Sequence, residues 1–149
     1  LMGMTDSSFQ DCPDTGRSTT AYKTFHRGSL VDQNSSVPVP VALSSAEAEY
    51  MGAANAATSL AHHRELTYDL EYMGTKEYDP EQVHGEVPSL ILVDNQATVA
   101  MSNNYKVSKM NRHIARRYHY VKQGVKTRTE ASIQQLKTCF WLLLICLDQ

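Results

Sequence analysis

Cysteine is scarce in this sequence, and a long apolar run is missing. The three cysteines are odd in number and form no Cys-x-x-Cys pair, so they predict neither a disulfide framework nor a zinc site and favour a reducing compartment. No signal peptide opens the chain, and the longest apolar run, residues 139–147, has nine residues. A membrane helix needs about 20. These absences argue against a secreted disulfide-rich protein and against a membrane partner.

Acidic residues are absent from a long stretch of the chain. Between Asn95 and Thr129 there is no Asp or Glu, whereas 8 of the 14 Lys and Arg residues lie there. Residues 1–94 hold 14 of the 16 acidic residues. A solvated helix usually interleaves acids with its bases, because opposite charges three or four residues apart attract. A solvated helix face and a face that binds a polyanion therefore both remain open.

The length of 149 residues is enough for one domain with a sizeable core. Because the chain starts at Leu1 rather than Met, we expect a piece of a longer protein. Three β-prone segments with short links predict an antiparallel meander: residues 1–9, 18–25 and 28–43. The third segment contains Pro38 and Pro40, which suit an edge strand or a bulge.

A long helix is predicted next. Ser44 or Ser45 is a suitable N-cap, and the alanine-rich tract behind it has high helix propensity. The helix is expected to run to about Met73 and to stop at Gly74. Its expected apolar stripe consists of Met51, Leu60, Leu66, Leu70 and Met73.

The second half of the chain predicts further strands and helices around a polar loop, 75–88. Four consecutive apolar residues, Leu90 to Val93, indicate a strand (89–96) that is buried on both faces. A short helix, a basic helix and a final strand are expected over residues 95–104, 108–126 and 130–136. The predicted order is β-β-β-α-β-α-α-β, an α/β fold.

Three carboxylates are notable for their positions: Asp6 on the first strand, Glu49 on the long helix, and Asp94 at the end of the buried strand. Each has an ordinary reading, as a solvated strand end, a helix-dipole partner and a helix N-cap respectively. Jointly, two strand ends and a helix can converge on one point. Clustered carboxylates repel unless cations lie among them, and their hard oxygens suit Mg²⁺ or Mn²⁺.

Four segments, in the right order, carry a family resemblance over roughly residues 1–127. SSAEAEY (44–50) resembles the Ser-Ser-x-Glu-Ala-Glu-Tyr signature of the ribonuclease H domain in copia-type retrotransposon polyproteins. VDNQ (93–96) is similar to the Asp-Asn-Gln segment of that family, and HIARRYHYV (113–121) to its His-Ile-x-x-Arg-Tyr-His block. TDSSFQDCPDTGRSTTAY (5–22) matches the opening Asp segment and the Arg-Ser-Thr-x-x-Tyr motif.

The resemblance implies a ribonuclease H-like α/β fold with a mixed five-stranded sheet and flanking helices. It implies hydrolysis of the RNA strand of RNA–DNA hybrids by a two-metal-ion mechanism with Mg²⁺, or Mn²⁺, held by Asp6, Glu49 and Asp94. Glu47 and Glu49 are two residues apart, so at most one is expected to face the interior. The family spacing favours Glu49 as the metal ligand, and Glu47 would then serve the helix start.

The resemblance also implies nucleic-acid contacts and partners. Asn95 and Gln96 are candidate contacts to the RNA strand. The basic helix would follow phosphates without reading sequence, through Arg112, Arg116, Arg117 and Lys122. The histidines are expected to be packing or surface residues rather than metal ligands: His62, His63, His113 and His119. The implied partners are the hybrid and the reverse transcriptase region of the same polyprotein, in the cytoplasm (virus-like particle) or nucleus.

The C-terminal residues depart from the family pattern. The family's fourth carboxylate is expected near residue 143, where this chain has Leu143, and Asp148 comes too late to replace it. Residues 138–149 therefore look like a truncated or frame-shifted tail after a domain over 1–137. Two functions stay open: an active hybrid nuclease, and a decayed retrotransposon remnant that keeps the fold and nucleic-acid binding without turnover. A generic α/β binding protein would require the four motifs to be a coincidence.

Overall fold

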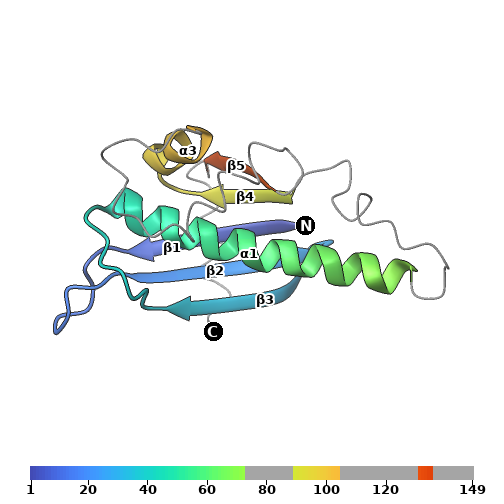
Figure 1. Cartoon of the computed structure of the whole chain (residues 1–149), viewed down its shortest axis with the longest axis horizontal. Coiled ribbons are helices and arrows are strands. Elements are labelled where there is room, and N and C mark those ends of the chain that lie inside the picture. Colours follow the sequence, from blue (N-terminus) through green and yellow to red (C-terminus); the bar gives the residue numbers. More distant parts are fainter. Residues whose placement is uncertain (73–88, 105–130, 136–149) are drawn as a thin grey trace.

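The computed structural model describes residues 1–72, 89–104 and 131–135 (Figure 1). Several sequence predictions fall outside these ranges. They are the polar loop 75–88, the basic helix 108–126 with its four proposed phosphate contacts, and the tail 138–149.

The described strands form one mixed sheet in the order β3-β2-β1-β4-β5. Strands β1 (Met2–Ser8), β2 (Thr19–His26) and β3 (Ser29–Ser36) pair antiparallel, as the predicted meander requires. Strands β4 (Ser89–Val93) and β5 (Ala131–Gln135) follow parallel to β1. The predicted α/β class with a mixed sheet is confirmed.

Strand β3 is an edge strand, and it ends earlier than the sequence prediction of 28–43. It stops at Ser36, directly before the segment with Pro38 and Pro40, because proline lacks the N–H that a ladder needs. A two-residue turn joins it to β2. Arg27 and Gly28 both have positive φ, 51° and 86°, the conformation that matches the twist of a hairpin.

Two described helices complete the fold: α1 (Ser45–Tyr72) and α3 (Gln96–Asn103). Helix α1 lies across one face of the sheet and contacts β1, β2 and β4 (Figure 1). Small residues make this contact close. A Cβ at Gly52 would lie 2.5 Å from Thr5 Oγ1, so no larger residue fits without a shift. The core combines alanines and larger residues of α1 with three sheet residues: Ala48, Met51, Ala53, Ala54, Ala56, Ala57, Leu60, Ile91, Val93 and Ile133.

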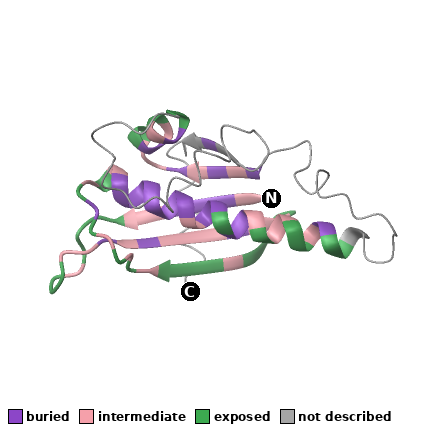
Figure 2. Ribbon diagram, in the orientation of Figure 1, coloured by how far each residue is buried: buried purple, intermediate pink, exposed green. Residues whose placement is uncertain are grey.

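The predicted apolar stripe of α1 is correct only in its first half. Met51 and Leu60 are buried, but Leu66 and Leu70 are 46% and 62% exposed. Helix α1 extends past the sheet at its C-terminal end, and its surface there is mostly exposed or half-buried (Figures 1 and 2). The stripe prediction was therefore wrong at Leu66 and Leu70, because the sheet does not reach that far.

Strand β4 is also less buried than its apolar run suggested. Ile91 and Val93 are fully buried, whereas Leu90 and Leu92 are half-buried. Ile91 pairs with Gly3, which lies under Leu60, so this side of the strand faces α1. The prediction of burial on both faces is wrong among the described residues, since α1 covers only one of them.

Candidate active site

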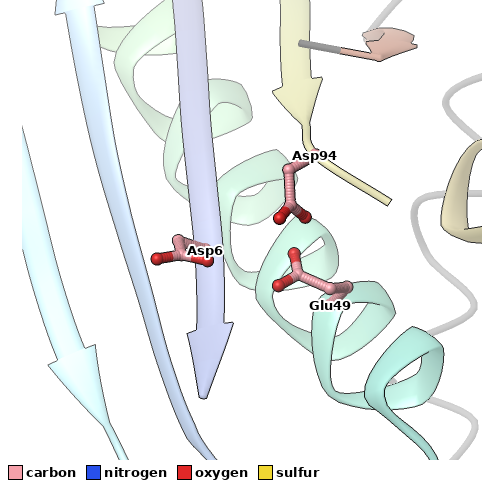
Figure 3. A group of neighbouring side chains, drawn as sticks. All are labelled: Asp6, Glu49 and Asp94. Carbon is pink, nitrogen blue, oxygen red and sulfur yellow. The ribbon is translucent and has the colours of Figure 1, made fainter. Parts of the chain in front are cut away.

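The sheet register brings Asp6 and Asp94 to the same level. In the parallel pair β1–β4, Met4 lies opposite Leu92. Asp6 comes two residues after Met4 on β1, and Asp94 comes two residues after Leu92, directly behind β4. Side chains two residues apart on a strand point to the same side. Asp94 follows the last residue of β4, so it marks the carboxyl end of that strand, and Asp6 lies beside it on β1 (Figure 3).

Glu49 reaches these aspartates from the first turns of α1. The N–H of Ser7 donates to Glu49 Oε1 at 2.8 Å and to Asp6 Oδ1 at 2.9 Å, so one backbone donor links the two carboxylates. The ladder between β1 and β4 ends at Met4, and the backbone beyond it is therefore accessible to a side chain. Gly52, one turn after Glu49, allows the close approach of α1 to β1.

The three carboxylates form a compact group. One oxygen from each of Asp6, Glu49 and Asp94 lies within 4.8 Å of the others, and Figure 3 shows the three side chains converging from β1, α1 and the end of β4. Glu49 is 3% exposed. Its Oε2 atom is buried and has no hydrogen-bond partner among the residues that the structure describes. A buried, unsatisfied carboxylate oxygen is costly unless a proton or a cation accompanies it.

Burial and mutual repulsion change the protonation of the group. Desolvation, followed by the charges of Asp94 and Asp6, raises the pKa of Glu49 to about 8, against a smaller lowering by the Ser7 hydrogen bond. Desolvation and the charge of Asp6 also raise the pKa of Asp94. Without a cation, the cluster therefore holds a proton on Glu49 near neutral pH.

Glu47 stabilises the helix start, although it too is buried, at 7% exposure. Its Oε2 accepts the N–H of Leu43 at 2.7 Å, and its own N–H donates to Ser44 Oγ at 3.2 Å. This reciprocal arrangement is close to a capping box. The expectation that only one of Glu47 and Glu49 is buried was wrong, because the segment before the helix provides a donor for Glu47.

Asn95, rather than Asp94, is the N-cap of α3. Its Oδ1 accepts the N–H of Ala97 at 2.9 Å and of Thr98 at 3.4 Å. Gln96, the first residue of the helix, is exposed. Of the two predicted RNA contacts, Asn95 thus has its side-chain oxygen engaged in the cap, and Gln96 is accessible beside Asp94.

Three residues that the sequence reasoning missed hold the site together. Ser7 provides the shared N–H, and its Oγ donates to the Ala48 carbonyl oxygen at 3.1 Å. Thr98, fully buried, donates from Oγ1 to the Ala46 carbonyl oxygen at 3.1 Å and so ties α3 to α1. Gly52 permits the helix contact. Only Gly52 had a signal in the sequence, as a glycine inside a helical pattern.

The surroundings of the cluster are partly open. A cavity of about 460 Å³ adjoins Asp6, and Met4, Lys23 and Gln33 are among its lining residues. The histidines of α1 lie elsewhere. His62 is exposed, and His63 Nδ1 is 2.8 Å from the Ser59 carbonyl oxygen. Within the described ranges, no helix is both long and apolar enough to cross a membrane.

The sheet order, the long helix over β1 and the carboxylates at the ends of β1 and β4 define a ribonuclease H-like fold. Ribonuclease H1 from the halophilic archaeon Halobacterium salinarum aligns with a TM-score of 0.57 at 13% identity, covering 92% of this chain and 85% of that one. This similarity shows the fold.

The sequence is 26% identical over 125 residues to the retrovirus-related Pol polyprotein from transposon TNT 1-94 of Nicotiana tabacum. The match covers 84% of this chain and 8% of the polyprotein. No family model matches the sequence. The chain is therefore a ribonuclease H-like domain similar to a small part of a retrotransposon polyprotein.

Proposed function

We propose that this domain hydrolyses the RNA strand of RNA–DNA hybrids as the ribonuclease H part of a retrotransposon polyprotein. The observation that carries the proposal is the convergence of Asp6, Glu49 and Asp94 from three separate elements, with ligand atoms within 4.8 Å of one another. The similarity to a Pol polyprotein supports the substrate class and the reverse transcriptase region as a partner.

The residues of the cluster fit a divalent cation. They offer hard carboxylate oxygens, which Mg²⁺ and Mn²⁺ prefer. The buried Oε2 of Glu49 has no hydrogen-bond partner in the described part of the chain, and burial together with the charges of Asp94 and Asp6 raises the pKa of Glu49. A cation bound by Asp6, Glu49 and Asp94 would relieve both costs. Mg²⁺ is proposed as the natural cofactor, with Mn²⁺ as a substitute.

The chain itself orients the ligands. The Ser7 N–H holds Glu49 Oε1, which fixes the carboxylate and leaves Oε2 available to the cluster. The hydrogen bonds of Ser7 and Thr98 to the first turns of α1 keep Glu49 at this position relative to both strands. Two bound cations would activate the attacking water and stabilise the leaving 3′-oxygen. Gln96, which is exposed and close to Asp94 in the chain, is proposed to contact the RNA strand. Asn95 is proposed to position Gln96 by capping α3.

The remaining contacts are proposals from the sequence. Arg112, Arg116, Arg117 and Lys122 would bind phosphates of the hybrid. Residues 1–137 are proposed as the ribonuclease H-like domain and 138–149 as a tail.

A second candidate function is a decayed remnant that binds the hybrid without cutting it. The observation that favours it is Leu143, which stands where the family resemblance places a fourth carboxylate. A two-metal site with one ligand fewer holds the shared metal more weakly. The domain would then cut only at a higher cation concentration, or it would not cut at all.

The test is cleavage of an end-labelled RNA–DNA hybrid in Mg²⁺ and then in Mn²⁺, beside Asp94→Asn. The nuclease proposal expects cuts in the RNA strand alone, and their loss in Asp94→Asn because a ligand is gone. A second measurement follows binding of the same hybrid across a salt series in Ca²⁺. A folded chain that binds with a steep salt dependence but never cuts would establish the remnant, and one that neither binds nor cuts would reject both.

A further inference from the structure

A buried hydroxyl ties helix α3 to the first turn of α1. Thr98 is fully buried, and its Oγ1 donates to the carbonyl oxygen of Ala46 at 3.1 Å, across 52 residues of sequence. Ala46 precedes Glu49 by three residues, so the two are neighbours one turn apart on the helix surface. The hydroxyl of Thr98 therefore sets where the turn that carries Glu49 lies relative to α3.

The same threonine is firmly connected to Asp94. Asn95, which follows Asp94, caps α3, and its Oδ1 and carbonyl oxygen accept the N–H of Thr98 at 3.4 and 3.1 Å. One turn further on, the hydroxyl of the fully buried Ser102 donates to the Thr98 carbonyl oxygen at 2.8 Å. These hydrogen bonds fix the backbone from the end of β4 into α3, so a movement of Thr98 would move Asp94 with it.

Glu49 is held to the two aspartates in different ways. Toward Asp6 the main chain acts directly, because the Ser7 N–H donates to both carboxylates. Toward Asp94 the link runs through α3 and α1, by way of the Thr98 hydroxyl. The separation of Glu49 from Asp94 therefore depends on a side-chain hydrogen bond, whereas its separation from Asp6 depends on a backbone donor.

The spacing of the three carboxylates affects which cation they fit. One oxygen from each lies within 4.8 Å of the others. Opposite ligand atoms of an octahedral Mg²⁺ lie about 4.2 Å apart, whereas the longer bonds of Ca²⁺ place them about 5 Å apart. Mg²⁺ also demands near-ideal geometry, and Ca²⁺ accepts irregular ligand sets. A small displacement of Asp94 from Glu49 therefore penalises Mg²⁺ more than Ca²⁺.

We propose that Thr98 is a positioning residue whose hydroxyl raises the selectivity of the carboxylate cluster for Mg²⁺ relative to Ca²⁺. The hydroxyl limits the separation of Glu49 and Asp94 and does not itself contact the cation. This inference rests on the cation site of the proposed function and deepens it, since it names a residue that makes the site selective. It does not require that the hybrid be cut.

The experiment measures the binding of Mg²⁺ and of Ca²⁺ to the full chain by isothermal titration calorimetry, without nucleic acid. Thr98→Val keeps the branched shape of the side chain and removes the hydroxyl. It should weaken Mg²⁺ binding about three- to tenfold, at or below the usual effect of residues that orient metal ligands. Ca²⁺ binding should weaken by less than about twofold. The ratio of the two affinities is the readout, because a general loss of stability lowers both.

Two variants on α3 are controls. Thr98→Ser keeps the hydroxyl, so it should retain the affinity ratio of the unchanged chain. Ser102→Ala removes a buried hydrogen bond within the same helix, and it should lower the melting temperature while the ratio stays the same. Thr98→Ala, which also removes the hydroxyl, takes the place of Thr98→Val should that variant fail to fold by circular dichroism.

Three results would overturn the proposal. Equal weakening of both cations in Thr98→Val, or no weakening, would leave Thr98 a role in stability alone. The same loss of the ratio in Thr98→Ser would assign the effect to packing rather than to the hydroxyl. An unchanged chain that binds neither cation would remove the site itself. Hybrid cleavage is scored separately, and Mg²⁺ selectivity that depends on Thr98 in a chain that never cuts would support this inference while contradicting the nuclease.

Discussion

The two faces of the sheet differ in the size of their side chains. The face under α1 uses small side chains, such as Gly3, Thr5 and the alanines of the helix, and contains the buried core. The opposite face uses large ones, such as Leu90, Leu92 and Phe25, and these side chains are half-buried. Small residues bring a helix close enough to place a carboxylate among the strands, whereas large residues supply buried area. The first face therefore both holds the buried core and positions Glu49, whereas the large side chains of the second face stay half-buried.

Removing the carboxylate of Glu49 should have the largest effect on function. Glu49→Gln keeps the shape of the side chain but removes a proposed metal ligand, and hybrid cleavage should fall about a hundredfold or more. Quantified cutting in Mg²⁺ checks this. Glu47→Gln is the matched control two residues away, and it should cut normally because Glu47 caps the helix. Equal losses in both variants would contradict the assignment of Glu49.

The same carboxylate predicts how stability depends on pH. The pKa of Glu49 is about 8 in the folded chain, above its ordinary value of 4.5, so the folded state binds the extra proton between these pH values. The free energy of unfolding should therefore fall by a few kcal/mol as pH rises from about 4.5 to about 8, in the absence of divalent cations. Urea unfolding across this range measures it.

Two conditions should remove that pH dependence. Glu49→Gln has no proton to lose, so its stability should be flatter over the same range. Mg²⁺ should raise the melting temperature more above pH 8 than at pH 6, because below the pKa it competes with the proton. A melting temperature that Mg²⁺ does not change at any pH would argue against a cation site in the cluster.

Truncations in the middle of α1 and near its exposed C-terminal end sharpen the contrast in packing. Leu60→Ala removes a fully buried side chain over Gly3 and should cost about 2–5 kcal/mol of unfolding free energy. Leu70→Ala, on the exposed end of the same helix, should change it by no more than about 0.5 kcal/mol. Urea unfolding of both variants compares them. A similar cost at both positions would mean that the end of α1 is covered.

The next largest loss of stability is expected from a substitution at Gly52, where α1 lies close to β1. Gly52→Ala would place a Cβ 2.5 Å from Thr5 Oγ1 and 3.0 Å from Ser7 Oγ, and should cost about 1–3 kcal/mol by overpacking. The double variant Gly52→Ala/Thr5→Ala removes the nearer atom and should recover part of this cost. Strict additivity of the two single changes in urea unfolding would show that Gly52 and Thr5 do not meet.

The smallest effect is expected at the cap of α3. Asn95→Ala removes the acceptor for two backbone N–H groups and should cost about 0.5–2 kcal/mol. Asn95→Asp keeps the acceptor and should retain most of the stability in thermal unfolding. The outcome that contradicts the capping role is an equal loss in both variants.

Among the described residues, the sequence predicted the order of the elements from local patterns, and it predicted the three clustered carboxylates from their places on two strand ends and a helix. Alternation, capping residues and short motifs are readable along the chain. The errors concern distances between elements. Leu66 and Leu70 fit the predicted apolar stripe of α1. The residues around them, however, do not indicate that the sheet ends before it reaches them. Glu47 is buried because the N–H of Leu43 pairs with its carboxylate, and Leu92 is half-buried because α1 covers the other face of β4.

The amide that joins Asp6 and Glu49 belongs to the main chain of β1, at Ser7. Every amino acid except proline supplies that donor, whatever its side chain. Drift at position 7 can therefore alter the Ser7 hydroxyl contact to α1 without releasing the two carboxylates from each other. A carboxylate spacing held by the backbone is therefore protected against most single substitutions at this position, and one proline would abolish it.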